Sequence, residues 1–198
     1  MSVRSIPVTI AVEGYTDTPI VQRILEHAGF QTGAVYEVRG KDQIDIRLPG
    51  YNNAARFAPW LVLRDLDQDA PCAPDLARTL LPAPSRHMCF RIAVHKVESW
   101  LLADSERLAL FLGVSAARIP QNPDQVADPK AALVKLARRS TSRAIRQDMV
   151  PRPNSGASVG PGYSGRIREF AAVKWRPRVA ATRSASLARC LHALRRWA

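Results

Sequence analysis

Residues 60–67 of this 198-residue chain read Trp-Leu-Val-Leu-Arg-Asp-Leu-Asp. The first four form a continuous apolar run, which is typical of a strand buried on both faces of a sheet. The run leads directly into Asp65 and Asp67, so we expect these acids at the carboxyl end of a strand. Extended geometry through this stretch would place both carboxylates on one side of the strand and Leu66 on the other.

Strands and helices alternate on both sides of this stretch. We expect strands at residues 6–13, 34–39 and 88–94, helices at 18–28, 53–57 and 75–81, and a long helix that ends at residue 112. This alternation predicts an α/β fold with a mainly parallel sheet and helices on both faces. Ligands of such sheets bind beyond the carboxyl ends of the strands.

Other polar residues follow the expected strands in the same way. Glu13 ends the first strand, and residues 95–98 (His-Lys-Val-Glu) follow the last one. Because the carboxyl ends of parallel strands share one edge, we expect these residues to meet Asp65 and Asp67. Clustered carboxylates repel one another, and Mg²⁺ or Mn²⁺ relieves that repulsion and activates an oxygen nucleophile. We therefore predict a metal site, to which Asp69 contributes if the extended geometry continues.

Charge is divided unevenly along the chain. Residues 1–129 contain 13 Lys and Arg against 15 Asp and Glu, a net charge of −2, whereas residues 130–198 contain 16 against 2, a net charge of +14. A basic segment beside an acidic one suits a protein that holds metal ions and a phosphate backbone. The alternative is a compositional bias toward arginine, although such a bias does not account for the loss of acids.

The basic part is expected to be a helical extension, residues 113–198, packed on an α/β domain of residues 1–112. Helices are predicted at residues 130–139 and 184–197, and a flexible loop at 151–165, where seven of fifteen residues are Gly or Pro. Tyr163 beside this loop is a candidate for stacking on bases, and the alternative is a solvated loop. The candidate phosphate-contacting residues are Lys130, Arg138, Arg139, Arg166 and Arg168.

Several classes of protein are excluded by what the sequence lacks. Its apolar runs are too short to cross a bilayer, and its start lacks the cleavage site of a secretory signal, so we expect a cytoplasmic protein with no membrane partner. Three widely spaced cysteines favour neither a disulfide framework nor a zinc site. Gly-rich phosphate-binding loops are absent, so we do not expect the chain itself to hydrolyse ATP.

Two motifs together resemble the Toprim fold. Residues 12–17 (Val-Glu-Gly-Tyr-Thr-Asp) and 63–67 (Leu-Arg-Asp-Leu-Asp) are similar to the Glu-Gly and Asp-x-Asp strand ends of primases, topoisomerases, maturase-type ribonucleases and OLD-family nucleases. The first motif is closest to the OLD-like branch. Residues 95–104 are similar to a poorly characterised Toprim-like family, whose members often occur beside an AAA or ABC-type ATPase in bacterial defence-like operons.

The resemblance covers residues 6–112 and implies roles for individual residues. Glu13 would be a metal ligand or general acid/base, and Asp65 and Asp67 would be metal ligands. Asp17 and Asp69 match nearby acidic positions, and Glu98 matches the additional acid of two-metal members. The implied function is a magnesium-dependent nuclease that works with an ATPase partner in anti-phage defence, and DNA is expected as its substrate ahead of RNA. An RNA-processing Toprim ribonuclease and a noncatalytic nucleic-acid or partner-binding module are the alternatives.

Each candidate residue also has a purely structural interpretation. The two aspartates of residues 63–67 can cap a helix or shape a loop, with Glu13 paired to Arg64. Glu98 at the start of a helix can serve the helix dipole or pair with Lys96. Lys96 is a catalytic candidate because its charge can stabilise the phosphoryl oxygens, but it can also be an exposed surface lysine. His95 is interpreted as a loop residue rather than a base.

Overall fold

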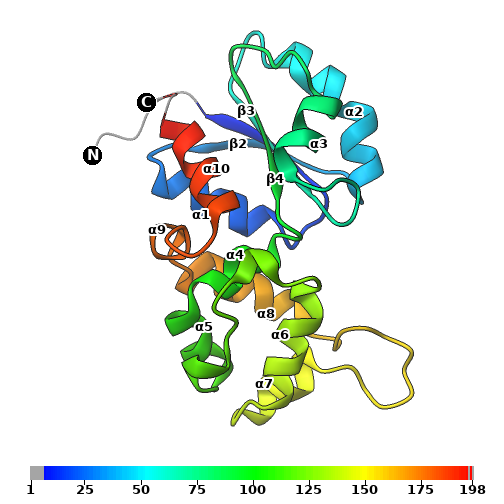
Figure 1. The fold of residues 1–198 in the computed structure, drawn as a ribbon, viewed down its shortest axis with the longest axis vertical. Helices are drawn as coiled ribbons and strands as arrows, with labels where there is room; N and C mark the ends of the chain where they lie inside the picture. The colour runs from blue at the N-terminus through cyan, green and yellow to red at the C-terminus, as the bar shows by residue number, and fades with distance from the viewer. Residues whose placement is uncertain (1–6, 196, 198) are drawn as a thin grey trace.

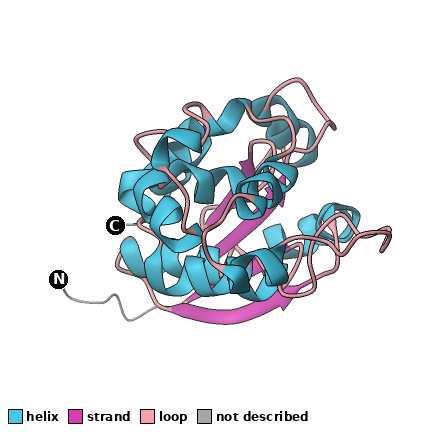
Figure 2. Ribbon diagram, turned by 90° about the horizontal axis from the view of Figure 1, so that it is seen from below, coloured by secondary structure: helices cyan, strands magenta, loops and turns pink. Residues whose placement is uncertain are grey.

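The computed structural model describes residues 7–195 and 197, which form a parallel sheet with helices on both faces (Figures 1 and 2). The four strands are β1 (Val8–Val12), β2 (Thr32–Glu37), β3 (Trp60–Asp65) and β4 (Met88–Ala93). Their order in the sheet is β2-β1-β3-β4, and every neighbouring pair is parallel. The predicted α/β class is therefore confirmed, and the architecture is consistent with a Toprim-like sheet.

Helices lie on each side of the sheet and beyond one of its ends. Figure 1 shows α2 and α3 on one face, α1 and α10 on the other, and α4 to α8 beyond the carboxyl ends of the strands. The α-helices are α1 (Thr18–His27), α2 (Lys41–Ala54), α3 (Ala73–Leu80), α4 (Glu98–Ala103), α5 (Ser105–Leu112), α6 (Pro129–Arg138), α7 (Arg143–Met149), α8 (Tyr163–Glu169), α9 (Pro177–Ala180) and α10 (Ala185–Arg195). The other helical segments are the 3-10 helices η1 (Ala116–Arg118) and η2 (Pro123–Gln125) and the π-helix η3 (Phe170–Lys174).

The apolar run of β3 supplies both faces of the sheet, as its sequence predicts. Leu61 and Leu63 belong to a core shared with α1, α4 and the C-terminal helices, whereas Trp60 and Val62 belong to a second core beneath α2 and α3. Alternate side chains of a strand point to opposite faces, so a strand with both faces covered has to be apolar throughout. Strand β3 ends at Asp65, and Leu66 beyond it is also buried.

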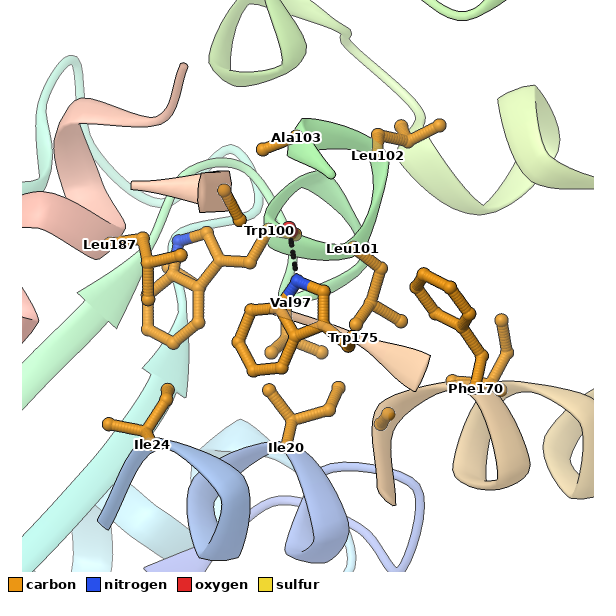
Figure 3. Close-up of a cluster of buried hydrophobic side chains, with 14 of the residues drawn as sticks. Ile20, Ile24, Val97, Trp100, Leu101, Leu102, Ala103, Phe170, Trp175 and Leu187 are labelled. Atoms are coloured by element: carbon orange, nitrogen blue, oxygen red, sulfur yellow. Dashed lines mark hydrogen bonds between the residues drawn. The ribbon is translucent and has the colours of Figure 1, made fainter. Parts of the chain in front are cut away.

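Helix α4 joins the sheet to the C-terminal helices, because all six of its residues are buried. Figure 3 shows Trp100 and Trp175 side by side between α4 and residues Ile20 and Ile24 of α1. The indole N–H of Trp175 donates to the backbone oxygen of Trp100 at 3.1 Å, and both rings are fully buried. The basic C-terminal part thus shares one hydrophobic core with β1 and α1.

Two helix predictions were wrong in their extent. Of the helix predicted at residues 53–57, only the first two residues are helical, at the end of α2, which has 14 residues and contains Pro49; residues 55–57 form a turn. Burial of one face, carried by Ile44, Leu48 and Tyr51, outweighs the poor helix propensity of its interior. The long helix predicted to end at residue 112 is divided into α4 and α5 at Asp104, whose backbone leaves the helical region and whose side chain caps α5.

The glycine- and proline-rich loop ends earlier than predicted and is held at its end. Helix α8 already begins at Tyr163. The N–H groups of Gly160 and Gly162 donate to the backbone oxygens of Met149 (3.0 Å) and Asp148 (2.8 Å). A Cβ atom on Gly160 would lie 2.4 Å from the oxygen of Asp148, so only glycine allows this approach.

Candidate functional site

Three strand ends are joined by hydrogen bonds at the carboxyl edge of the sheet. Glu13 follows β1, and its Oε1 accepts a hydrogen bond from the backbone N–H of Asp65 at 2.7 Å, at the end of β3. Asp65 Oδ1 in turn accepts from the backbone N–H of Val97 at 2.9 Å, just before α4. The structure therefore brings Glu13 and Asp65 together at one edge, as the order of the strands predicts.

Two further carboxylates complete an acidic cluster, which we define as Glu13, Asp17, Asp65 and Glu98. Asp17 lies at the start of α1, where its Oδ2 accepts from the N–H of Gly14 at 3.0 Å. Glu98 is buried, and its Oε1 accepts from the hydroxyl of Tyr163 at 3.3 Å, with Lys130 Nζ at 3.8 Å. The C-terminal helices α6 and α8 therefore reach the cluster through Lys130 and Tyr163.

Burial and neighbouring charges make three carboxylates of the cluster, Glu13, Asp17 and Asp65, harder to ionise. Burial, followed by the charges of Asp17, Glu13 and Glu98, raises the pKa of Asp65 well above its usual value. Burial and the charge of Glu98 raise the pKa of Asp17 to about 7. Burial also raises the pKa of Glu13, although the N–H bond from Asp65 opposes the shift. The cluster thus concentrates negative charge that only a cation or a proton can offset.

Asp67 is near this cluster but does not follow the predicted geometry. Strand β3 ends at Asp65, and Asp67 has a left-handed backbone with φ of 49°, so the expectation of extended structure through both aspartates is wrong. Its Oδ1 pairs with Lys96, and its Oδ2 lies 3.3 Å from Lys41 Nζ. Burial tends to raise the pKa of Asp67, but the bonds from Lys96 and Lys41 outweigh it and lower the pKa.

Asp69 belongs to an ion-pair network outside the cluster. Its Oδ1 lies 2.6 Å from Lys41 Nζ, and its Oδ2 lies 2.7 Å from Arg64 Nη2. Arg64 is nearly fully buried and also pairs with Asp45 at 2.8 Å. Asp69 was predicted to join a metal site if the strand continued. Because the chain turns before it and both of its oxygens face cations, we leave Asp69 out of the candidate site.

The ion-pair network around Asp69 shows which acids pair with Arg64, and it includes residues that were not predicted from the sequence. Arg64 forms its ion pairs with Asp45 and Asp69 rather than with Glu13. Lys41 and Asp45 come from α2, and no spacing in the sequence links them to residues 63–67. The Nδ1 atom of His95 lies 3.2 Å from the backbone oxygen of Asp67, so the ring has a hydrogen-bond partner in the neighbouring loop.

The chemistry of the acidic cluster fits a divalent cation, although its side chains do not form a ready coordination sphere. All its donors are carboxylate oxygens, which Mg²⁺ and Mn²⁺ prefer. Glu13, Asp17 and Asp65 each use one oxygen to accept a backbone N–H. Within residues 7–195 and 197, no three His, Cys, Asp or Glu side chains are arranged to hold a metal ion as they stand. Binding would therefore require rotation of these side chains.

The five candidate phosphate-contacting residues lie in different environments. Arg166 is engaged with Asp148 (2.8 Å) and Glu169 (2.9 Å), which leaves it poorly placed to hold phosphate. Arg168 is exposed and lies over the ring of Tyr15. Lys130 approaches Glu98, and Arg138 and Arg139 are exposed on and beside α6.

Tyr163 is not the exposed stacking residue that its position beside the loop suggested. It is buried, and its hydroxyl donates to Glu98. Burial, followed by the negative charge of Glu98, raises its pKa far above the usual value. Tyr163 therefore donates a hydrogen bond to the acidic cluster, and its buried ring is not accessible for stacking on a base.

A basic cavity of about 340 Å³ lies at the far end of α6. Its charged lining consists of Arg118, Lys135 and Arg139, and its other lining residues are Pro120, Ala132 and Leu136. Three cations around one hollow without an acid in its lining form an environment that attracts phosphate. Of these three residues, only Arg139 was a candidate from the sequence. Arg118 lies outside the strongly basic segment, and Lys135 lies inside it but was not selected.

In a metal-free buffer, we expect the protein to lose stability as pH rises from about 4 to 7. The unfolded chain releases the Asp17 proton near the ordinary value of 3.8, whereas the folded protein holds it to about 7. Ionisation of Asp17 therefore lowers the free energy of unfolding progressively across this interval. Above about pH 7 the loss does not increase further. Asp17→Asn keeps an acceptor for Gly14 and should raise the free energy of unfolding at pH 8 by about 1 to 3 kcal/mol. Urea titrations with EDTA at pH 5 and pH 8 measure both effects, and an unchanged difference between the two pH values in the variant would contradict this account.

No helix of the described residues is long and apolar enough to span a membrane.

The comparisons with known proteins add no relative. Searches against family models, curated proteins and solved structures found no match for this chain.

Proposed function

We propose that this protein is a divalent-metal-dependent nuclease that hydrolyses phosphodiester bonds in DNA or RNA. The observation that carries this proposal is the acidic cluster, in which carboxylates from β1, α1, β3 and α4 meet at the ligand-binding edge of a parallel sheet. A fold gains no stability from crowding charges whose pKa values are raised in this way. Such an arrangement is instead typical of a functional site.

The residues of the cluster divide the work of hydrolysis between them. Glu13, Asp17 and Asp65 would hold Mg²⁺ or Mn²⁺, with Glu98 beside them. When bound, the ion neutralises charge on the phosphoryl oxygens and lowers the pKa of an attacking water.

Lysines surround the acids and can contact the phosphate directly. Lys96 pairs with Asp67 and also interacts electrostatically with Asp65 and Glu98, so its ammonium group lies beside the cluster. Its charge can stabilise the negative charge that develops on the phosphoryl oxygens. Lys130 occupies a similar position next to Glu98 at the start of α6.

We expect the basic cavity to hold part of the phosphate backbone. Replacing both Lys135 and Arg139 by Ala should weaken oligonucleotide binding uniformly across sequences and reduce the slope of log K against log salt by about 2. Fluorescence anisotropy at four salt concentrations in EDTA measures this. The matched control replaces the exposed Arg47 and Arg86 of the N-terminal part. An equal loss of slope in the control would show that overall charge, rather than the cavity, holds the backbone.

The proposal is tested with purified protein, labelled DNA and RNA, and Mg²⁺, Mn²⁺, Ca²⁺ or EDTA. Metal-dependent product formation is expected, together with a rise in melting temperature on adding Mn²⁺. The rise should be lost in Glu13→Gln, which keeps an acceptor for the Asp65 N–H. Because thermal stabilisation reports metal binding without catalysis, it separates a failure of the metal site from a failure of turnover.

A second candidate function is a noncatalytic module that binds nucleic acid. It is favoured by the ion pairs of Asp67 with Lys96 and Lys41, since lysines that neutralise a carboxylate take the place of a cation there. This module would bind oligonucleotide in EDTA with unchanged affinity on adding Mn²⁺, and its melting temperature would not respond to the metal.

A further inference from the structure

An exposed aromatic ring lies directly beside the acidic cluster. Tyr15 comes two residues after Glu13, and 49% of it is exposed. The guanidinium carbon of Arg168, on α8, lies 5.1 Å from the centre of its ring. Arg168 is itself exposed. The two side chains thus form a solvent-accessible pair at the border between the sheet and the basic helices.

The backbone beneath this pair is fixed to the cluster. Glu13 is held by the N–H of Asp65, and the N–H of Gly14 is held by Asp17. The backbone at Tyr15 therefore keeps a defined position relative to the carboxylates. Large aromatic side chains in this chain are mostly packed inside it, as Trp100 and Trp175 are, so a half-exposed tyrosine at this edge is available to a ligand.

We propose that Tyr15 and Arg168 form a platform on which an unpaired base of single-stranded nucleic acid stacks, next to the acidic cluster. The flat faces of a phenol ring and a guanidinium group both stack on bases, and neither requires a particular sequence. In a duplex the base faces are covered by their neighbours, so the platform selects single strands. The inference rests on the proposed function, because it names the form of nucleic acid that reaches the site.

The test measures binding without cleavage. Labelled single-stranded DNA and the matching duplex are titrated with the full chain in EDTA by fluorescence anisotropy. Tyr15→Ala should weaken single-strand binding roughly 5- to 150-fold, the range found for the loss of one stacked base, and leave duplex binding unchanged. Tyr15→Phe keeps the ring and should restore affinity to within about 3-fold, and a 2-aminopurine probe should lose its fluorescence quenching only in Tyr15→Ala.

The chain provides a matched control at the opposite end of the sheet. Phe57 precedes β3, is 82% exposed and has Arg56 over its ring at 6.0 Å. Phe57→Ala should leave single-strand binding unchanged. Equal losses in Tyr15→Ala and Phe57→Ala, equal losses for single strand and duplex, or no single-strand binding by the unmodified chain would each overturn the platform.

The outcomes also separate the platform from the proposed nuclease. Cleavage that persists with unchanged single-strand affinity in Tyr15→Ala rejects the platform and keeps the nuclease. Tyr15-dependent binding without cleavage in Mg²⁺ or Mn²⁺ rejects the nuclease and supports the platform.

Discussion

Asp65→Asn is expected to lower metal-dependent cleavage by about 10³-fold, the scale of the several kcal/mol that a bound cation contributes to phosphoryl chemistry. Asparagine retains an oxygen that can accept the N–H of Val97, so the bond that joins β3 to α4 can persist. What the substitution removes is the charge at the centre of the acidic cluster. The measurement is the initial rate of cleavage with saturating Mn²⁺.

The folded state should not suffer from this change. Because the pKa of Asp65 is raised well above its usual value, its ionised form opposes folding at neutral pH, and asparagine relieves that cost in metal-free buffer. Asp75→Asn on the exposed surface of α3 is the matched control and should cleave normally. Full activity in Asp65→Asn, with intact folding shown by circular dichroism, would remove the acidic cluster from the mechanism.

Trp175→Ala is expected to lower the free energy of unfolding by about 3 to 5 kcal/mol, the usual cost of deleting a fully buried large aromatic side chain. For a chain of this length, that corresponds to a fall in melting temperature of about 6 to 20 °C. Urea denaturation followed by tryptophan fluorescence and circular dichroism measures the loss. The free energy of unfolding of Trp175→Phe should lie between those of the unmodified protein and Trp175→Ala. Phenylalanine keeps much of the buried aromatic surface but cannot donate the hydrogen bond to the backbone oxygen of Trp100.

The control for this prediction is nearby in the chain. Val173 is 63% exposed, and Val173→Ala should change the free energy of unfolding by less than about 0.5 kcal/mol. If both substitutions destabilised the protein equally, the packing of Trp175 against α1 and α4 could not be the cause.

The sequence predicts the sheet best where burial leaves the strongest pattern. The bounds of β1, β3 and β4 agree with prediction to within two residues, since their apolar runs serve covered faces. Strand β2 lies at the edge of the sheet with its last four residues exposed, and its bounds also agree with prediction to within two residues, shifted in the same direction at both ends. Helix α2 was mostly missed, because one buried face has to compensate for a proline in its interior.

The candidate site was predictable as far as it follows from topology. Glu13, Asp65 and Glu98 follow neighbouring parallel strands, and the order of those strands alone brings them to one edge. The turn at Asp67 was not predictable, since an aspartate in the left-handed region has no distinctive sequence signal. Lys41 was missed and Tyr163 was given a different role, because their contacts with Asp67 and Glu98 arise from α2 and α8 through the folding of the whole chain.

Because α4 is enclosed on every side, the acid-rich and base-rich parts of this polypeptide cannot swing apart as two lobes on a hinge. Separating them would expose Trp100, Trp175 and all of α4 to solvent, at a free-energy cost comparable to that of unfolding. The opposite charges are thus held at a constant spacing. A bound polyanion would have to adapt its conformation to that spacing, because the two parts of the protein do not move relative to each other.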